Sequence, residues 1–275
     1  MNMDSRMTKK VSLAYSPCPN DSYVMSAIAT KKVKLPDVEF DIFLHDIDTL
    51  NKAAFEKRYD IIKVSCHTYL QIRDKYKLLD TGAAVGYECG PLLLASKIRS
   101  LHQLQDCSIA FPGKQTTAYL LFQLSGIRTG NHYFIPYDEI IPQVKSGKYD
   151  CGVIIHESRF TYRASGLHFI CDLGKWWEEK TKLPVPLGCF VIRNNIEDEF
   201  ARNFETLMSR SFSNRTVDDA GSDEYIIEHS LEMDPDVLKN HIELYVNEFT
   251  KSLGTAGHRA ISVLAEYASM QGLIS

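Results

Sequence analysis

The sequence predicts an α/β protein of two lobes, with mixed, mainly parallel sheets, a hinge and a cleft between the lobes. Three observations predict it. Strand-like and helix-like segments alternate three times over residues 11–76, which is typical of a parallel sheet flanked by helices. The alternation starts again at residue 107, after an apolar segment at residues 90–96. From residue 197 onward the pattern is helical only, so the chain closes with a helical tail.

Three strands and three helices make up the first alternation. Each strand is a short apolar or alternating run, and each helix follows a polar or capping residue. Asp21 or Ser22 is the expected N-cap of the first helix. The expected strands are residues 11–15, 38–44 and 59–65, and the expected helices are residues 22–32, 47–58 and 66–76.

The second alternation lies between two apolar segments that we interpret as crossings between lobes, residues 90–96 and 183–193. A glycine closes its first helix, as is common at helix C-termini. The expected strands are residues 107–113, 132–137 and 149–157, and the expected helices are residues 114–126 and 138–148. The helical tail is expected at residues 198–215, 222–233, 235–250 and 255–271.

The two crossings divide the chain into lobes. Residues 1–95 and 187–275 form a discontinuous lobe one, which carries the helical tail, and residues 96–186 form lobe two, inserted within it. The C-terminal ends of strands and the starts of helices converge between two such lobes. We therefore expect a small-molecule ligand in this interlobe cleft.

Composition and charge exclude several classes of function. The 275 residues include 31 basic and 35 acidic side chains, a formal net charge of −4, so no surface for nucleic acid is expected. No stretch reaches the roughly 18 apolar residues of a membrane span. Two prolines after the first strand interrupt any signal-peptide core. We expect a cytoplasmic protein with no membrane partner, and the sequence indicates no oligomeric state.

The seven cysteines are widely spaced and include no Cys-x-x-Cys pair. This usage is typical of reduced thiols packed as small hydrophobic groups, so no disulfide and no metal site is expected. For Cys18 a second interpretation stays open. It stands between two prolines near a helix start, where a thiol can become a nucleophile, although no histidine lies near it in the sequence.

Two strand ends of lobe one carry polar residues towards the expected cleft. After the first strand, Asn20 and Asp21 either cap a turn or contact the ligand. After the third strand, Ser65 either caps the next helix or belongs to a helix start that binds an anion through free N–H groups. Lys63, just before it, is unusual near the end of an apolar strand.

Two strand ends of lobe two also carry polar residues towards the expected cleft. Thr116 and Thr117 open a helix after a glycine turn, a place that suits a hydroxyl or an anion. His156 ends an apolar strand and is either a structural histidine or a general base with a pKa near neutrality. Glu157 and Arg159 either pair with each other or hold the loop. No second histidine follows one turn later, so the zinc-protease motif is absent.

Eight segments, taken in order and at compatible spacing, resemble the 1,4-dihydroxy-6-naphthoate synthase family of the futalosine route to menaquinone. They are SPCPND, DIIKVSCHTYLQI, CGPLLLAS, PGKQTTAYLL, GVIIHESRFTY, DLGKWWEEKT, PVPLGCFVIR and HIELYVNEFT. The resemblance implies a periplasmic-binding-protein type II-like fold used as an enzyme. It implies a lyase that converts cyclic dehypoxanthine futalosine to 1,4-dihydroxy-6-naphthoate and releases dihydroxyacetone, without metal or organic cofactor.

The resemblance also assigns site residues. His156, in the IIHE segment, matches the family's proposed proton acceptor. The implied substrate contacts are Lys63, Val64, Ser65, Thr116, Thr117 and Asp21, with Asn20 beside it. Three places depart from the family pattern. Glu88 replaces a residue that is usually small, Lys182 replaces a usual glycine, and Glu228–Glu232 differs after its histidine.

Two other functions stay open. A chorismate dehydratase, the sister enzyme of the same pathway, has a related fold and is expected to lack the IIHESRFTY stretch. A non-catalytic solute-binding or sensor protein on this fold is usually exported, and no signal peptide is expected here.

Overall fold

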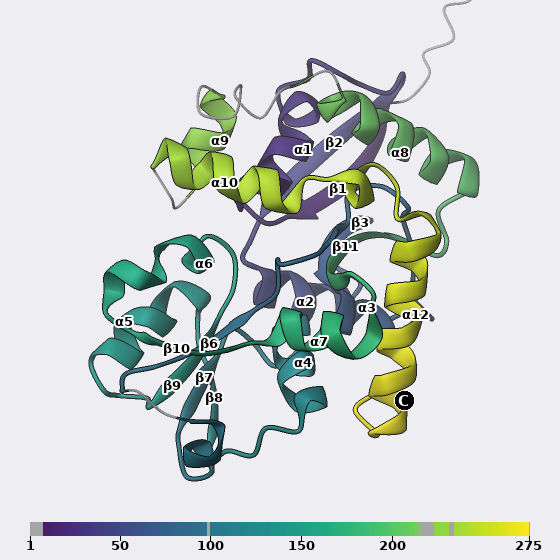
Figure 1. Ribbon diagram of the computed structural model, residues 1–275. Coiled ribbons are helices and arrows are strands. Elements are labelled where there is room, and N and C mark those ends of the chain that lie inside the picture. The colour runs from purple at the N-terminus through teal and green to yellow at the C-terminus, as the bar shows by residue number, and fades with distance from the viewer. Residues whose placement is uncertain (1–7, 98–99, 214, 216–222, 231–233, 275) are drawn as a thin grey trace, which may run out of the picture.

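The computed structural model describes residues 8–97, 100–213, 215, 223–230 and 234–274. Figure 1 shows two groups of strands, each with its own helices, and C-terminal helices beside both. The expected helix at residues 222–233 is described only for residues 223–230. The family departure at Glu228–Glu232 also lies partly outside the described residues.

The first sheet has six strands in the order β2-β1-β3-β11-β4, with β5 paired to β11. Its strands are β1 (Lys9–Tyr15), β2 (Val38–Leu44), β3 (Ile61–Ser65), β4 (Tyr76–Leu78), β5 (Ala84–Gly86) and β11 (Val185–Arg193). Strands β1, β2 and β3 run parallel, because α1 (Pro19–Ala29) and α2 (Ile47–Phe55) form the crossovers between them. Strand β11 returns from the second lobe and pairs antiparallel with β3.

The second sheet has five strands in the order β10-β6-β9-β7-β8. Its strands are β6 (Leu92–Ala95), β7 (Ile109–Phe111), β8 (His132–Phe134), β9 (Cys151–Ile154) and β10 (His168–Asp172). Its β7, β8 and β9 run parallel, and β6 and β10 complete it antiparallel. Both sheets are therefore mixed.

The pairing of β6 corrects the boundary between the lobes. We expected the first segment of lobe one to end at residue 95, but Leu92–Ala95 pairs with β9 and so belongs to the second sheet. All four of its residues are buried. A segment that crosses between lobes and a central strand covered on both faces have the same apolar pattern. The sequence therefore could not distinguish between them.

The next α-helices along the chain are α3 (Cys66–Gln71), α4 (Thr117–Ser125), α5 (Ile140–Lys145), α6 (Ser158–Thr161) and α7 (Leu173–Thr181). Among them, α3 packs on β3 and β11 of the first sheet, α5 packs on β7 and β9 of the second, and α7 contacts both sheets. The sequence predicted no element at β5, β10, α6 or α7, and its predicted helix at residues 66–76 runs past the end of α3 at Gln71 into Tyr76 of β4.

The first helix starts earlier than predicted. Its N-cap is Cys18, with Pro19 at the first helical position, rather than Asp21 or Ser22. A proline fits there because its fixed φ suits the helix and its missing N–H would have no partner in the helix. Asp21 consequently lies in the first turn, with its side chain free for another use.

The C-terminal helices touch both lobes. They are α8 (Asp198–Phe212), α9 (Glu224–His229), α10 (Pro235–Tyr245), α11 (Glu248–Lys251) and α12 (Gly254–Met270). Helix α8 packs on α1, as expected for a tail on lobe one. However, α10 also contacts α6, and α12 also contacts α4, both in lobe two (Figure 1).

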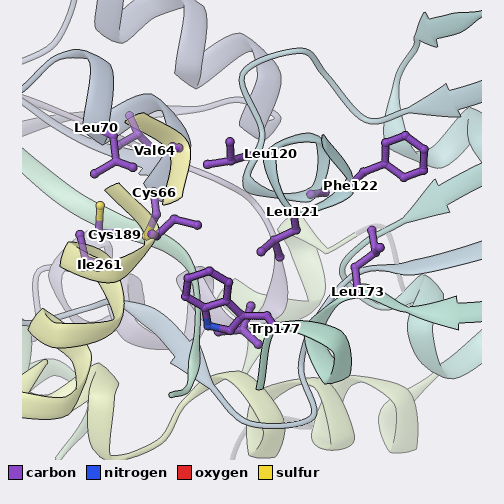
Figure 2. Packing of buried hydrophobic residues seen from close by; sticks show 14 of the residues in the cluster. Val64, Cys66, Leu70, Leu120, Leu121, Phe122, Leu173, Trp177, Cys189 and Ile261 are labelled. Atoms are coloured by element: carbon purple, nitrogen blue, oxygen red, sulfur yellow. The ribbon is translucent and has the colours of Figure 1, made fainter. Parts of the chain in front are cut away.

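One hydrophobic cluster is continuous across the junction of the lobes. Figure 2 shows Val64 and Cys189 from the first sheet, Leu121 from α4, Trp177 from α7 and Ile261 from α12 in this cluster. Trp177 is fully buried and its indole N–H donates to the Pro184 carbonyl over 3.0 Å. Cys18 of lobe one and His156 of lobe two also lie 3.5 Å apart, Sγ to Nδ1, so the lobes lie together in this conformation. Among the described residues all seven cysteines are free thiols, as expected.

Candidate active site

A cavity lies between the lobes. Its walls come from the ends of β1, β3 and β9, from the starts of α1 and α4, and from β11 and α10. Seven residues predicted for the site line it: Asn20, Asp21, Lys63, Ser65, Thr116, Thr117 and His156. Val64 does not line it. Its side chain points into the hydrophobic cluster, since alternate residues of a strand face opposite sides of the sheet.

A buried ion pair forms the lobe-one wall. Lys63 Nζ donates to Asp21 Oδ1 over 2.7 Å and to the Gly82 carbonyl over 2.9 Å, and both side chains of the pair are almost fully buried. The ammonium also lies 4.7 Å from the centre of the Phe190 ring. Burial raises the pKa of the Asp21 carboxyl, while the charge of Lys63 acts in the opposite direction. These partners explain how a lysine is tolerated in an apolar strand.

Asn20 links this ion pair to helix α10 through hydrogen bonds. Asn20 Nδ2 donates to Asp21 Oδ1 over 2.9 Å, and Asn20 Oδ1 lies 2.9 Å from His241 Nε2. His241 is fully buried, and burial lowers its pKa well below the ordinary histidine value. His241 was not among the residues predicted for the site. Its only signal was its place at the head of the HIELYVNEFT segment.

Ser65 does not cap α3 as one alternative expected, because its side chain makes no capping hydrogen bond. Instead, the side-chain amide of Asn51, on α2, makes two hydrogen bonds with Ser65. Asn51 Nδ2 donates to Ser65 Oγ over 3.0 Å, and Ser65 N–H donates to Asn51 Oδ1 over 2.9 Å. The hydroxyl of Ser65 therefore keeps its own proton for a ligand. No pattern in the sequence pointed to Asn51.

The two threonines of lobe two differ in their roles. Thr116 is the N-cap of α4 and accepts from Tyr119 N–H over 3.3 Å. Thr117 joins the lobes, because its hydroxyl donates to the Leu187 carbonyl over 2.7 Å and accepts from His67 N–H over 3.2 Å. The Thr117 hydroxyl is thus occupied in the closed conformation.

His156 lies just beyond β9 and lines the cavity. Its backbone adopts a left-handed φ of +57°, an unusual conformation for a residue with a Cβ. Nδ1 lies 3.5 Å from Cys18 Sγ, and Nε2 is buried without a hydrogen-bond partner among the described residues. Burial, helped by the positive charge of Lys63, lowers the pKa of His156 to about 4. The imidazole is therefore neutral at pH 7, with the lone pair that a base requires.

Cys18 has the histidine neighbour that the sequence could not provide. Its thiol accepts a hydrogen bond from Ser16 Oγ over 2.8 Å and faces His156 across the lobes. Burial, with the nearby Glu157 carboxylate, raises the pKa of the Cys18 thiol well above its ordinary value. A neutral thiol is a poor nucleophile, so the geometry favours Cys18 as a neighbour that orients His156.

Arg159 holds the loop, which was one of the two alternatives. Arg159 donates to the Gly90 carbonyl and to Asp172 Oδ2, each over 2.7 Å. Asp172 in turn caps α7 through the N–H groups of Gly174 and Lys175. This network fixes the segment after His156 against the crossing between the lobes.

Tyr245, on α10, also lines the cavity and was not predicted. Its hydroxyl donates to the Cys89 carbonyl over 3.1 Å. In the part of the chain that the structure describes, no three His, Cys, Asp or Glu side chains are grouped to hold a metal ion. Within the same residues, no helix combines the length and the apolar character that a membrane crossing requires.

These features define a class of protein: a two-lobed α/β ligand-binding fold of the periplasmic-binding-protein type, closed around an internal cavity. The alkanesulfonate-binding protein SsuA from Xanthomonas axonopodis pv. citri shares this fold with a TM-score of 0.73 and 15% identity, over 98% of this chain and 95% of that chain. The chain belongs to the menaquinone biosynthesis family, whose model matches residues 11–270.

Two named relatives agree with this assignment, and a third protein has a similar crystal structure. The 1,4-dihydroxy-6-naphtoate synthase of Streptomyces coelicolor is 39% identical, over 95% of this chain and 94% of its own length. The enzyme of the same name from Thermus thermophilus is 37% identical over the same shares. Protein AF1704 from Archaeoglobus fulgidus has a crystal structure with a TM-score of 0.88 and 33% identity, covering 98% of this chain and 100% of that chain.

Proposed function

We propose that this chain is a 1,4-dihydroxy-6-naphthoate synthase, a carbon–carbon lyase of menaquinone biosynthesis. Family membership and the two relatives that carry this name support the activity. The observation that carries the mechanism is a neutral His156 on the wall of the interlobe cavity, half-buried and with its Nε2 shielded from water. A solute-binding protein needs no such base, and no observation favours a chorismate dehydratase.

His156 is the proposed general base. It takes the proton of a substrate hydroxyl, the electrons of that O–H bond form a carbonyl as the adjacent C–C bond breaks, and the proton returns to the carbon that receives the electrons of the broken bond. The ring becomes the aromatic dihydroxynaphthoate, and the fragment leaves as dihydroxyacetone. A well-placed base contributes about 10²–10⁴-fold to such a step. Closure of the lobes keeps water from the reacting carbanion.

The remaining cavity residues bind and orient the substrate. The start of α4, at Thr117 and Ala118, offers backbone N–H groups to a carboxylate, while the Thr116 N–H donates to the Gly113 carbonyl. Ser65 and Asn20 offer donors to hydroxyl or carbonyl oxygens. Lys63 and Asp21 act mainly through each other, since their hydrogen bonds already join them. Any part for Val64 is through its backbone. A cytoplasmic location and independence from cofactors stay predictions from the sequence.

The test is an incubation of the purified protein with cyclic dehypoxanthine futalosine, followed by absorbance and mass. His156→Asn is the informative variant, because asparagine tolerates a positive φ and removes the base without new backbone strain. We expect product from the wild type and a loss of about 10²–10⁴ in kcat for the variant.

Binding of the product, measured by its fluorescence, is the control for folding of the variant site. Binding without turnover by the wild-type protein would mean that the cavity belongs to a receptor. An active His156→Asn protein would leave the function in place and refute the assignment of the base.

A further inference from the structure

A chain of buried hydrogen bonds runs from the cavity wall to helix α10. Lys63 Nζ donates to Asp21, Asn20 Nδ2 donates to the same carboxylate oxygen, and Asn20 Oδ1 faces His241 Nε2, at 2.7, 2.9 and 2.9 Å. His241 is 0% exposed, Asp21 and Lys63 are each 3% exposed, and Asn20 is 8% exposed. Because these groups are shielded from water, each needs another group of the chain as its hydrogen-bond partner.

The charges in this chain determine how the Asn20 amide is oriented. Asp21 Oδ1 already accepts from an ammonium, so only the NH₂ end of Asn20 can approach it without placing two acceptors together. The carbonyl end of Asn20 must then face α10. It needs a donor there, and His241 Nε2 is the group at hydrogen-bond distance. His241 must therefore carry its proton on Nε2.

The surroundings of His241 agree with this neutral tautomer. Its ring packs on Tyr245, with ring centres 4.6 Å apart, and lies near Phe160 and His156, at 6.3 and 6.4 Å. Its Nδ1 is buried and finds no partner among the described residues. An imidazolium in this aromatic enclosure would leave a second N–H without an acceptor.

We infer that His241 is a positioning residue for substrate binding, which holds the Asn20 amide with its NH₂ group towards Asp21 and the cavity. The inference rests on the proposed function for the identity of the substrate. Asn20 lines the cavity, and its second Nδ2 proton has no acceptor among the described residues. The lobe-one wall therefore presents a hydrogen-bond donor, which selects an acceptor oxygen of the substrate.

Turnover of cyclic dehypoxanthine futalosine by a set of variants tests this inference. His241→Leu removes the donor to Asn20 Oδ1, and His241→Gln restores an N–H close to the place of Nε2. We expect KM to rise about tenfold in His241→Leu, with kcat changed less than about threefold, because a binding contact is lost. His241→Gln should recover most of the loss. Ile242→Val, on the same helix, is the matched packing control and should keep the wild-type KM.

A double-mutant cycle separates positioning from general damage. If His241 acts through Asn20, the variant that combines His241→Leu with Asn20→Ala should have the KM of Asn20→Ala alone. Multiplied effects of the two changes would overturn the inference. So would a His241→Gln protein as impaired as His241→Leu.

The tautomer can be measured without substrate. Side-chain ¹⁵N spectra of the histidines in the free protein should show a proton on Nε2 of His241, assigned by its loss in His241→Gln. A proton on Nδ1 would overturn the inference even if His241→Leu fails to fold. A wild-type protein that makes no product would instead refute the proposed function, and the ¹⁵N spectrum would then decide the inference alone.

Discussion

His156 shows how much of a site is decided by a single residue's surroundings. Its position at a strand end was visible in the sequence, as was its ability to act as a base. The left-handed φ of +57°, the contact with Cys18 and the neutral state at pH 7 come from the fold. Cys18 and His156 are 138 residues apart in the sequence, so no sequence pattern could have paired them.

The pH dependence of activity follows from the state of His156. A base works when it is unprotonated, and burial lowers its pKa to about 4. Activity should therefore be lost as the pH falls through about 4, not through the ordinary value near 6.5. We expect kcat/KM, measured from pH 4 to 8, to stay level down to about pH 5.

Circular dichroism at each pH serves as the control for acid unfolding. A midpoint of kcat/KM near pH 6.5 in a folded protein would contradict this prediction. It would mean that the imidazole is exposed to water in the free enzyme.

At the scale of elements, the family departures acquire a structural meaning. Lys182 stands where glycine is usual, and it is the left-handed C-cap of α7, with φ +61° and its N–H bonded to the Glu178 carbonyl. Glu88 also has a positive φ, of +57°. Both positions favour small residues because a Cβ is strained in this conformation. Neither lines the interlobe cavity, so the departures concern local stability.

Lys182→Gly should raise the free energy of unfolding by about 1 kcal/mol, because it removes the left-handed strain at the helix end. Urea denaturation would measure the change. Glu179→Gly, in the exposed interior of the same helix, is the matched control and should lower the stability by about 1 kcal/mol. Equal destabilisation by both glycines would show that the α7 C-cap carries no strain.

At the scale of the whole molecule, hydrophobic packing and hydrogen bonds hold the two lobes together. The hydrophobic cluster of Figure 2 runs through both lobes, and polar contacts surround the cavity. The backbone carbonyl of Gln115 in lobe two accepts hydrogen bonds from the side chains of Asn51 and Thr68 in lobe one, over 3.4 and 3.0 Å. Gly113 lies so close to Asp48 that an added Cβ would be 2.3 Å from Oδ1. This fit exists only when the lobes are together.

Thr117→Val should shift the molecule towards open forms. The variant keeps the shape of the side chain but loses the hydrogen bonds to Leu187 and His67, which costs about 1–3 kcal/mol in the closed state. We expect a higher KM and a larger radius of gyration in small-angle X-ray scattering. Thr206→Val, the same change at an exposed hydroxyl on α8, should leave both unchanged. A closed Thr117→Val protein with normal KM would contradict this account of closure.

The sequence by itself determined the α/β class, the two alternating regions, the helical tail and most of the polar strand ends, because these follow from local periodicity and capping. It also carried the family resemblance, which the comparisons confirm. The tertiary structure alone decided the sheet of β6, the early start of α1 and the burial of Val64 away from the cavity. It alone joined Cys18 to His156 and Asn20 to His241, because contacts between distant residues depend on how the lobes close, and no local pattern records that.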